Sequence, residues 1–291
     1  MQNTYKSKFE LFSLERYVWV LVIAWTFTVA GLLTWSIVQT RLRIREMAVN
    51  EARANFNKDQ AFRLWATSHG GVYVPVDENT PPNPYLSNIS ERDIETPSGR
   101  RLTLMNPAYM IRQMNEEFSS LYGVAGHITS LKPLRPENAP DDWERMALEA
   151  FERGETEVLE FTEIDGAPYL RLMQPMITQD GCLKCHESQG YKVGDVRGGV
   201  GVALPMDSLL TRERQIIVAQ VLSLGLVWLF GLVGIGLGSR ETMWRVRERK
   251  RAEQALEAVD IELQTALARE QQLARTDSLT GVNNRRHLYE L

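Results

Sequence analysis

Two long apolar runs divide the chain into a short N-terminal segment, a large middle part and a C-terminal part. The runs cover residues 17–38 and 216–238. Each is long enough to cross about 30 Å of hydrocarbon, which takes about 20 helical residues. The first run exceeds the about 7 to 15 apolar residues of a signal peptide, and no small-residue cleavage site follows it. The second has no charged residue, which favours a span over a buried core helix. The pattern therefore predicts two membrane-spanning helices.

Basic residues around the second span predict the orientation of the chain. Arg212 and Arg214 precede the span, and six basic residues follow it: Arg240, Arg245, Arg247, Arg249, Lys250 and Arg251. Lys and Arg are enriched on the cytoplasmic side of membrane spans. We therefore expect the N-terminal segment 1–16 and the C-terminus in the cytoplasm of a bacterium. The middle part, 39–215, then forms an extracytoplasmic (periplasmic) domain at the inner membrane.

Within this middle part, helical and strand patterns alternate. The segment 69–100 is rich in Gly and Pro and is expected to form a long ordered loop. The pair Asp165-Gly166 favours a hairpin because it tolerates positive φ. The expected helices are Leu42–Phe62, Leu104–Phe118 and Asp141–Arg153, and the expected strands are Val158–Ile164, Tyr169–Met176 and Val200–Leu204. Helices, a hairpin and a last strand leading into the second span together indicate an α+β domain.

A spaced apolar series continues beyond the second span, in residues 239–273. Its members are Ala252, Leu256, Val259, Leu263, Ala266 and Leu273, interrupted by the charged Glu270. A three-four spacing is typical of a coiled coil, which brings chains together. We expect a cytoplasmic coiled-coil helix and a homodimer, with a solvated juxtamembrane helix as the alternative.

The composition narrows the possible partners. The chain of 291 residues is 44% hydrophobic, and its 33 basic and 37 acidic side chains give a formal net charge of −4. No long basic run occurs away from the membrane flanks. Nucleic acid is therefore not expected as a partner, whereas a membrane is.

Cys182, Cys185 and His186 form the motif that carries chemistry, C-x-x-C-H. Two thiols at this spacing form thioethers with the vinyl groups of haem, and the adjoining imidazole binds the iron as proximal ligand. A zinc site would need further ligands, and the chain has no other cysteine. A redox dithiol normally opens a helix of a thioredoxin-like βαβ unit, which the pattern here does not predict; a structural disulfide is the remaining alternative. The motif predicts one covalently bound haem c.

Further candidates surround this motif. His69 is the leading candidate for the iron ligand opposite the proximal histidine, because its flanking glycines permit close approach to a macrocycle. Met105 and His127 are alternatives, as is a vacant or exchangeable position; a methionine at helical spacing more often fills a core. Lys192 and Arg197 are candidate partners of the haem propionates, since cationic side chains bind carboxylates. A solvated loop is the alternative for these two.

Several segments of the middle part resemble a family of periplasmic c-type haem sensor domains with a PAS-like fold. The resemblance covers nearly all of residues 60–206. It is carried by Trp143-Glu144, by the C-x-x-C-H motif and by the segments 69–74, 104–110, 130–133, 170–175 and 190–199. It implies a PAS-like input module of a signalling protein. Some members use a cysteine as the second iron ligand, but both cysteines of this chain belong to the attachment motif, so that ligand is excluded here.

Residues 274–286 resemble the opening of GGDEF diguanylate cyclase domains. The resemblance is carried by Asp277 and by Leu279-Thr280-Gly281, which follow the coiled-coil pattern in the expected order. It implies a parent protein that converts two GTP to cyclic di-GMP. The GGDEF signature itself is absent from these 291 residues. We therefore expect no catalytic residue in the chain as given, and a role for GTP only through the missing part of that domain.

These patterns predict a transmembrane sensor whose haem responds to redox state or a diatomic gas and regulates a diguanylate cyclase through a dimeric coiled coil. A membrane-anchored electron-transfer cytochrome c is the alternative. A truncated regulator that binds partners without catalysis is a third possibility.

Overall fold

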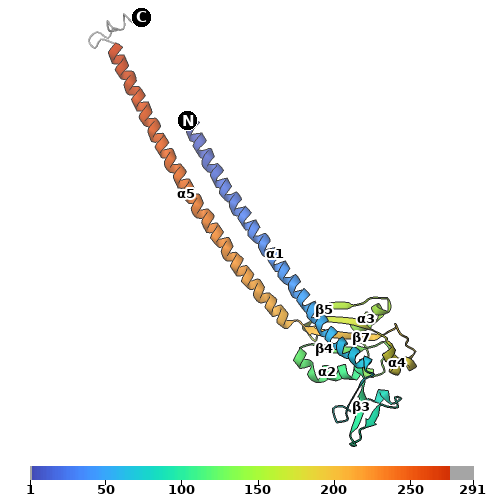
Figure 1. Cartoon of the computed structure of the whole chain (residues 1–291). Helices are drawn as coiled ribbons and strands as arrows, with labels where there is room; N and C mark the ends of the chain where they lie inside the picture. Colours follow the sequence, from blue (N-terminus) through green and yellow to red (C-terminus); the bar gives the residue numbers. More distant parts are fainter. Residues whose placement is uncertain (1, 276–291) are drawn as a thin grey trace. The chain divides into compact units, whose positions relative to one another are not determined.

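The computed structural model describes residues 2–275 of the chain (Figure 1). The GGDEF-like segment expected at 274–291 therefore lies outside the described residues, apart from its first two positions. The chain divides into two units. Ser36–Ala219 forms one unit, which we call the folded domain, and the helical segments before and after it form the other.

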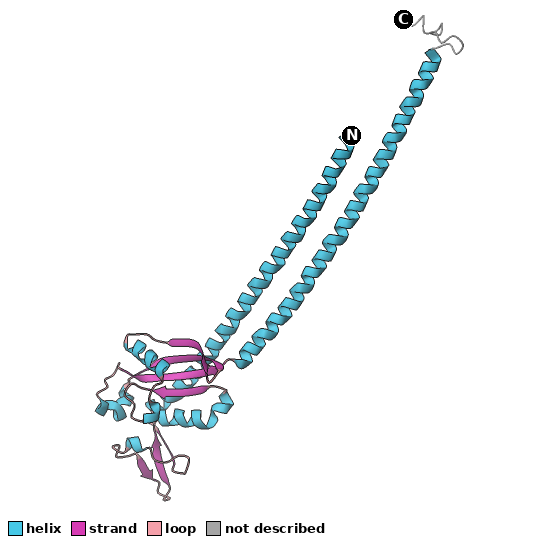
Figure 2. Cartoon of the chain, turned by 180° about the vertical axis from the view of Figure 1, so that it is seen from behind, coloured by secondary structure: helices cyan, strands magenta, loops and turns pink. Residues whose placement is uncertain are grey.

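The structure is mixed α+β, as expected, and its strands lie within the folded domain (Figure 2). The elements in chain order are α1 (Gln2–Ser68), β1 (Val72–Pro75), η1 (Pro84–Leu86), β2 (Asp93–Glu95), β3 (Arg101–Met105), α2 (Pro107–Tyr122), β4 (Ala125–Thr129), η2 (Pro136–Asn138), α3 (Asp142–Glu152), β5 (Val158–Ile164), β6 (Ala167–Ile177), α4 (Asp180–His186), η3 (Glu187–Gln189), β7 (Val196–Pro205) and α5 (Asp207–Arg275).

Two antiparallel sheets are present in this domain. The larger has the strand order β4-β7-β6-β5, and the smaller has the order β1-β3-β2. The expected hairpin is confirmed as β5 and β6, with Asp165 at φ 51° and Gly166 at φ 78° in its turn. β6 pairs along most of its length with β7, so after the segment that connects them the chain comes back alongside β6.

Alternation along β6 separates two apolar cores on the two faces of the larger sheet. Leu170, Leu172 and Met176 face the core that contains residues of α1 and α2. Met173 faces the core that contains residues of α3. On α1 the buried residues recur at helical spacing: Ile44, Ala48, Ala52 and Phe56. The period of two along a strand and the i, i+4 spacing along a helix explain why both patterns meet in one core.

Several expected elements differ from the structure: the helix expected at Leu42–Phe62 is part of the longer α1, and the last strand begins at Val196 instead of Val200. The helix expected from Leu104 begins only at Pro107, because Leu104 and Met105 belong to β3 and Asn106 caps the helix. The Asn106 side chain accepts from Tyr109 N at 3.1 Å. The Gly- and Pro-rich segment 69–100 is only partly irregular, since β1 and β2 within it pair with β3. The order of β1 and β2 comes from their pairing with β3, which the pattern of residues within the segment itself does not indicate.

The other unit contains the apolar parts of α1 and α5. Both helices are long and apolar enough to cross a membrane, by length and composition. Within this unit the Trp25 indole donates to Trp228 O, and the Trp228 indole donates to the Thr26 hydroxyl, both at 3.1 Å. These bonds join the two apolar segments to each other.

Candidate functional site

The short helix α4 carries the C-x-x-C-H motif directly after β6. Both cysteines are free thiols and are partly buried. Residues three apart lie on neighbouring positions of one helix face, so both thiols point to the same side of α4. The Gln179 N–H donates to Cys182 Sγ at 3.5 Å at the start of the helix. Burial raises the pKa of the Cys185 thiol above its usual value.

His186, the last residue of α4, is held in one orientation. Its Nδ1 lies 2.5 Å from Gln189 Oε1, and the Gln189 amide in turn donates to Lys132 O at 3.3 Å. Since Oε1 only accepts, the proton lies on Nδ1, and Nε2 keeps its lone pair. Burial, followed by the nearby Arg197 charge, lowers the pKa of His186. The ring is therefore a neutral imidazole whose Nε2 carries a lone pair, the form that binds metals.

Arg197 lies against this imidazole. One guanidinium nitrogen donates to His186 Nε2 at 3.0 Å, and the other donates to Met176 Sδ at 3.4 Å. The backbone carbonyl of Arg197 accepts from the Ser130 hydroxyl at 2.7 Å, which fixes the start of β7. Burial is the main cause of the lowered pKa of Arg197. The guanidinium therefore stands at the atom through which His186 would bind a metal.

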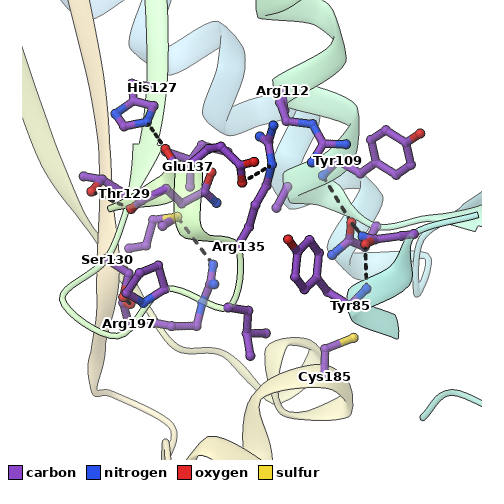
Figure 3. Close-up of a pocket in the computed structure, with 18 of the residues that line it drawn as sticks. Tyr85, Tyr109, Arg112, His127, Thr129, Ser130, Arg135, Glu137, Cys185 and Arg197 are labelled. Carbon is purple, nitrogen blue, oxygen red and sulfur yellow. Dashed lines mark hydrogen bonds and ion pairs between the residues drawn. The ribbon is translucent and has the colours of Figure 1, made fainter. Parts of the chain in front are cut away.

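A pocket of about 320 Å³ opens beside α4 (Figure 3). Its walls come from η1, α2, β4, η2 and the region around α4, and they include Cys185, His186 and Arg197. In Figure 3 Cys185 lies near Tyr85 at one end of the pocket, and His127 lies at the opposite end. Met176, buried at the end of β6, is a further wall residue.

His127 lines this pocket, but both of its ring nitrogens are bonded. Nδ1 lies 2.8 Å from Glu144 Oε1, and Nε2 lies 3.3 Å from Glu137 O. The hydrogen bond to Glu144 is the main cause of the raised pKa of His127. Glu144 is 4% exposed and also pairs with Arg171, so the group joins β4, α3 and β6. His127 is thus engaged in a packing contact.

The structure does not bring Cys182, His69, Met105 or Lys192 to the pocket walls. His69 is exposed, its Nδ1 lies 2.8 Å from Trp65 O, and its ring packs against the Trp65 ring at a tilt of 35°. The glycines after it serve to end α1: Gly70 and Gly71 adopt φ 76° and 100°, which favours glycine. Met105 is buried at the end of β3, and Lys192 is exposed in a loop.

Arg63 is a site residue that the sequence reasoning missed. Its side chain is only 9% exposed, and Nε donates to Gln60 Oε1 at 2.7 Å. Burial and then the charge of Arg197 lower the pKa of Arg63 to about 10, while Cys182 acts in the opposite direction. The signal that could have indicated Arg63 was its position on the face of α1 that is buried, which it shares with Asp59 and Ala66.

α4 contacts α1 next to this arginine. A Cβ at Gly181 would lie 2.9 Å from Thr67 Cγ2 and 3.2 Å from Thr67 O, so only glycine fits there without a shift. Cys182, the next residue, is close enough to Arg63 and Arg197 to influence the pKa of both. The attachment helix, the end of α1 and two buried guanidinium groups thus form one cluster.

Neither of these two arginines forms an ion pair with a carboxylate in the described part of the chain. Among the described residues, no three His, Cys, Asp or Glu side chains are placed together to hold a metal ion. The cluster instead offers two thiols, one oriented imidazole and unneutralised positive charge. This set suits a ligand that is bound covalently, coordinated by nitrogen and negatively charged at its edge.

Comparison with known proteins gives one family and one solved structure. The Tll0287-like family model matches residues 40–205, more than half of the chain. The solved structure is described as the crystal structure of the cyanobacterial heme-protein Tll0287, and it is 16% identical. It covers 54% of this chain and 94% of its own, with a TM-score of 0.37, which is too low to support an argument. No curated protein matches the chain.

Proposed function

Because the chain belongs to the Tll0287-like family, we propose that its folded domain binds one haem covalently. Cys182 and Cys185 would form the two thioethers, and His186 would be the proximal iron ligand. The observation that carries this proposal is the orientation of His186. Gln189 holds its Nδ1, so that the lone pair of Nε2 is presented beside a pocket that Cys185 also lines.

The residues present fit this group. Both thiols are free, and their i, i+3 spacing on α4 makes them neighbours on one helix face, with Cys185 in the pocket wall. The buried guanidinium of Arg197 stands at His186 Nε2 and would have to move aside for a metal. When bound, the haem would supply a one-electron centre or a site for a diatomic gas. The chain itself orients the imidazole, keeps the Met176 side chain buried beside it and places positive charge at the edge of the site.

For the sixth iron position, we propose His69 or an exchangeable site. His69 lies outside the pocket, so its ligation requires the turn after α1 to move. His127 already lies in the pocket wall, but it could bind the iron through Nδ1 only if its bond to the buried Glu144 were broken. Met105 would have to leave its buried place at the end of β3.

We further propose that this domain is a PAS-like periplasmic sensor held in a bacterial inner membrane by the apolar parts of α1 and α5. The proposal is supported by the length and apolar composition of both helices and by the basic residues that follow residue 238. α5 follows β7 after one residue, so the strand that carries Arg197 leads directly into the second apolar segment. A change at the haem would pass through α5 to a dimeric coiled coil and a GGDEF output domain.

Haem staining of the full chain after denaturing electrophoresis tests the attachment. The chain is expressed with and without a c-type haem maturation system. Wild type matured in this way should retain haem in the denatured band, and Cys182→Ser combined with Cys185→Ser should lose it. Gln189→Ala is a useful second variant, since it leaves the thiols intact and should retain haem with an altered axial histidine signal. Haem that is lost from the wild type on denaturation would overturn the proposal.

A further inference from the structure

α1 buries a positive charge at the candidate site. Arg63 is 9% exposed, and the partner of its Nε is the neutral amide of Gln60. Burial of a charged group is costly unless an opposite charge or several hydrogen bonds compensate it. Arg63 lies on the same helix face as the apolar residues that pack on the sheet. If this position served packing alone, an apolar side chain would be more stable there than a buried charge.

A second positive charge lies close by. Arg197 is near enough to lower the pKa of Arg63, and both groups lie within electrostatic reach of Cys182. In the described part of the chain, neither arginine forms an ion pair with Asp or Glu, as stated above. Two like charges that are withdrawn from water repel each other, and in the described part of the chain they are compensated only by hydrogen bonds to the neutral groups of Gln60, His186 and Met176. A negatively charged group bound between them would remove this penalty.

The position of this cluster limits what the anion is. Gly181 packs on Thr67, one helical turn beyond Arg63, so the start of α4 is in direct contact with the end of α1. A macrocycle bonded to Cys182 would therefore lie near the end of α1 that carries Arg63. Guanidinium groups bind carboxylates through two parallel hydrogen bonds, and the haem periphery carries two propionate carboxylates.

We propose that Arg63, together with Arg197, binds a propionate carboxylate of the covalently attached haem. This inference rests on the proposed function and adds a role for α1, which contributes no residue to the C-x-x-C-H motif. α1 is one helix from Gln2 to Ser68, and its sequence contains the apolar segment 17–38. The bond between Arg63 and the propionate would therefore join the cofactor to a helix that also forms the first proposed span.

The test uses the full chain, matured with haem and purified in detergent. The variants are Arg63→Leu, Arg63→Gln and Arg63→Lys, with Arg43→Leu as control because Arg43 is an exposed arginine of the same helix. Three quantities are measured: covalent haem per chain, the haem midpoint potential and the propionate bending band in resonance Raman spectra. Wild type is also titrated with acetate.

We expect all variants to carry covalent haem, and Arg43→Leu to match wild type in the other two quantities. Arg63→Leu and Arg63→Gln should shift the propionate band and lower the midpoint potential, because a lost positive charge stabilises the ferric state. Arg63→Lys should keep most of the midpoint potential but still shift the band, since ammonium lacks the two-pronged geometry. Acetate should change neither quantity in wild type.

Each contrary result has a distinct meaning. An unchanged propionate band in every Arg63 variant that carries haem overturns the proposal, even where the midpoint potential falls. If Arg63→Leu and Arg63→Gln fail to fold, Arg63→Lys decides on the same criterion. A saturable effect of acetate on wild type would show that the cluster takes a soluble carboxylate, and this also overturns it. Wild type without covalent haem would instead mean that the proposed function is wrong.

Discussion

Gly181→Ala places a methyl group between α4 and the last turn of α1. The added Cβ would lie 2.9 Å from Thr67 Cγ2 and 3.2 Å from Thr67 O. Thr67 resists rotation because its hydroxyl donates to Arg63 O at 2.8 Å. Over-packing of this kind costs about 1–3 kcal/mol. Alanine in place of glycine regains up to about 1 kcal/mol of helix propensity. We therefore expect a net destabilisation of about 1–2 kcal/mol.

Thr67→Ser provides the matched background for this substitution. It removes the nearer of the two close contacts and keeps the hydroxyl that bonds to Arg63 O. In that background only the contact with the carbonyl oxygen of residue 67 stays close, so Gly181→Ala should cost clearly less, and a double-mutant cycle should give a coupling of about 1 kcal/mol. Gly201→Ala is the control, because the nearest atom to its added Cβ lies 3.7 Å away, an ordinary contact.

The assay is thermal unfolding of the full chain in detergent, followed by near-ultraviolet circular dichroism of the folded domain. For a domain of this size, 1 kcal/mol corresponds to a change in Tm of about 2–4 °C. The reasoning is refuted if the two substitutions are additive within about 0.5 kcal/mol. It is also refuted if Gly181→Ala is as stable as wild type while Gly201→Ala is not.

Three other predictions follow from the same structure. The pKa of His127 is raised above 6.5 mainly by its bond to Glu144, so its stabilisation is complete below that pH and is lost as the pH rises through the raised pKa. Glu144→Gln should remove this pH dependence, which amounts to about 1 kcal/mol between low and high pH and is small because the His127 side chain is 44% exposed. Urea unfolding across that pH range measures the free energy of unfolding, and an unchanged slope of this free energy against pH would contradict the prediction. Reporter fusions near residue 120 should be active only as periplasmic reporters, and those near residue 270 only as cytoplasmic ones; the reverse pattern would contradict the proposed orientation. His69→Ala should convert low-spin ferric haem to high-spin; an unaltered absorption spectrum would exclude His69 as the sixth ligand.

The elements that could be predicted from the sequence are those set by local chemistry. The hairpin at Asp165-Gly166 follows from a turn pair that tolerates positive φ. α3 begins after Asp141 because this residue and Glu144 form a capping box. By contrast, β1 and β2 are short and depend on pairing with β3, so the sequence around them shows mainly Gly and Pro.

The candidate site divides in the same way. The thiols and imidazole of α4 are adjacent in the sequence, so their spacing alone indicated the chemistry. Arg63 could not be found by a motif, because the fold brings it to Cys182 from a distant helix. The glycines after His69 suggested close approach to a ligand, whereas in the structure they end a helix. A glycine pattern does not distinguish these two uses.

The intact mass of the full chain, matured with haem, tests the central claim most directly. The claim predicts that the denatured wild-type chain is heavier than its sequence by one haem, and that the added mass maps to the peptide containing Cys182 and Cys185. The variant with both cysteines replaced by serine should show the unmodified mass. An unmodified wild-type mass, together with haem released by acidic acetone, would contradict covalent attachment and with it the account of this site.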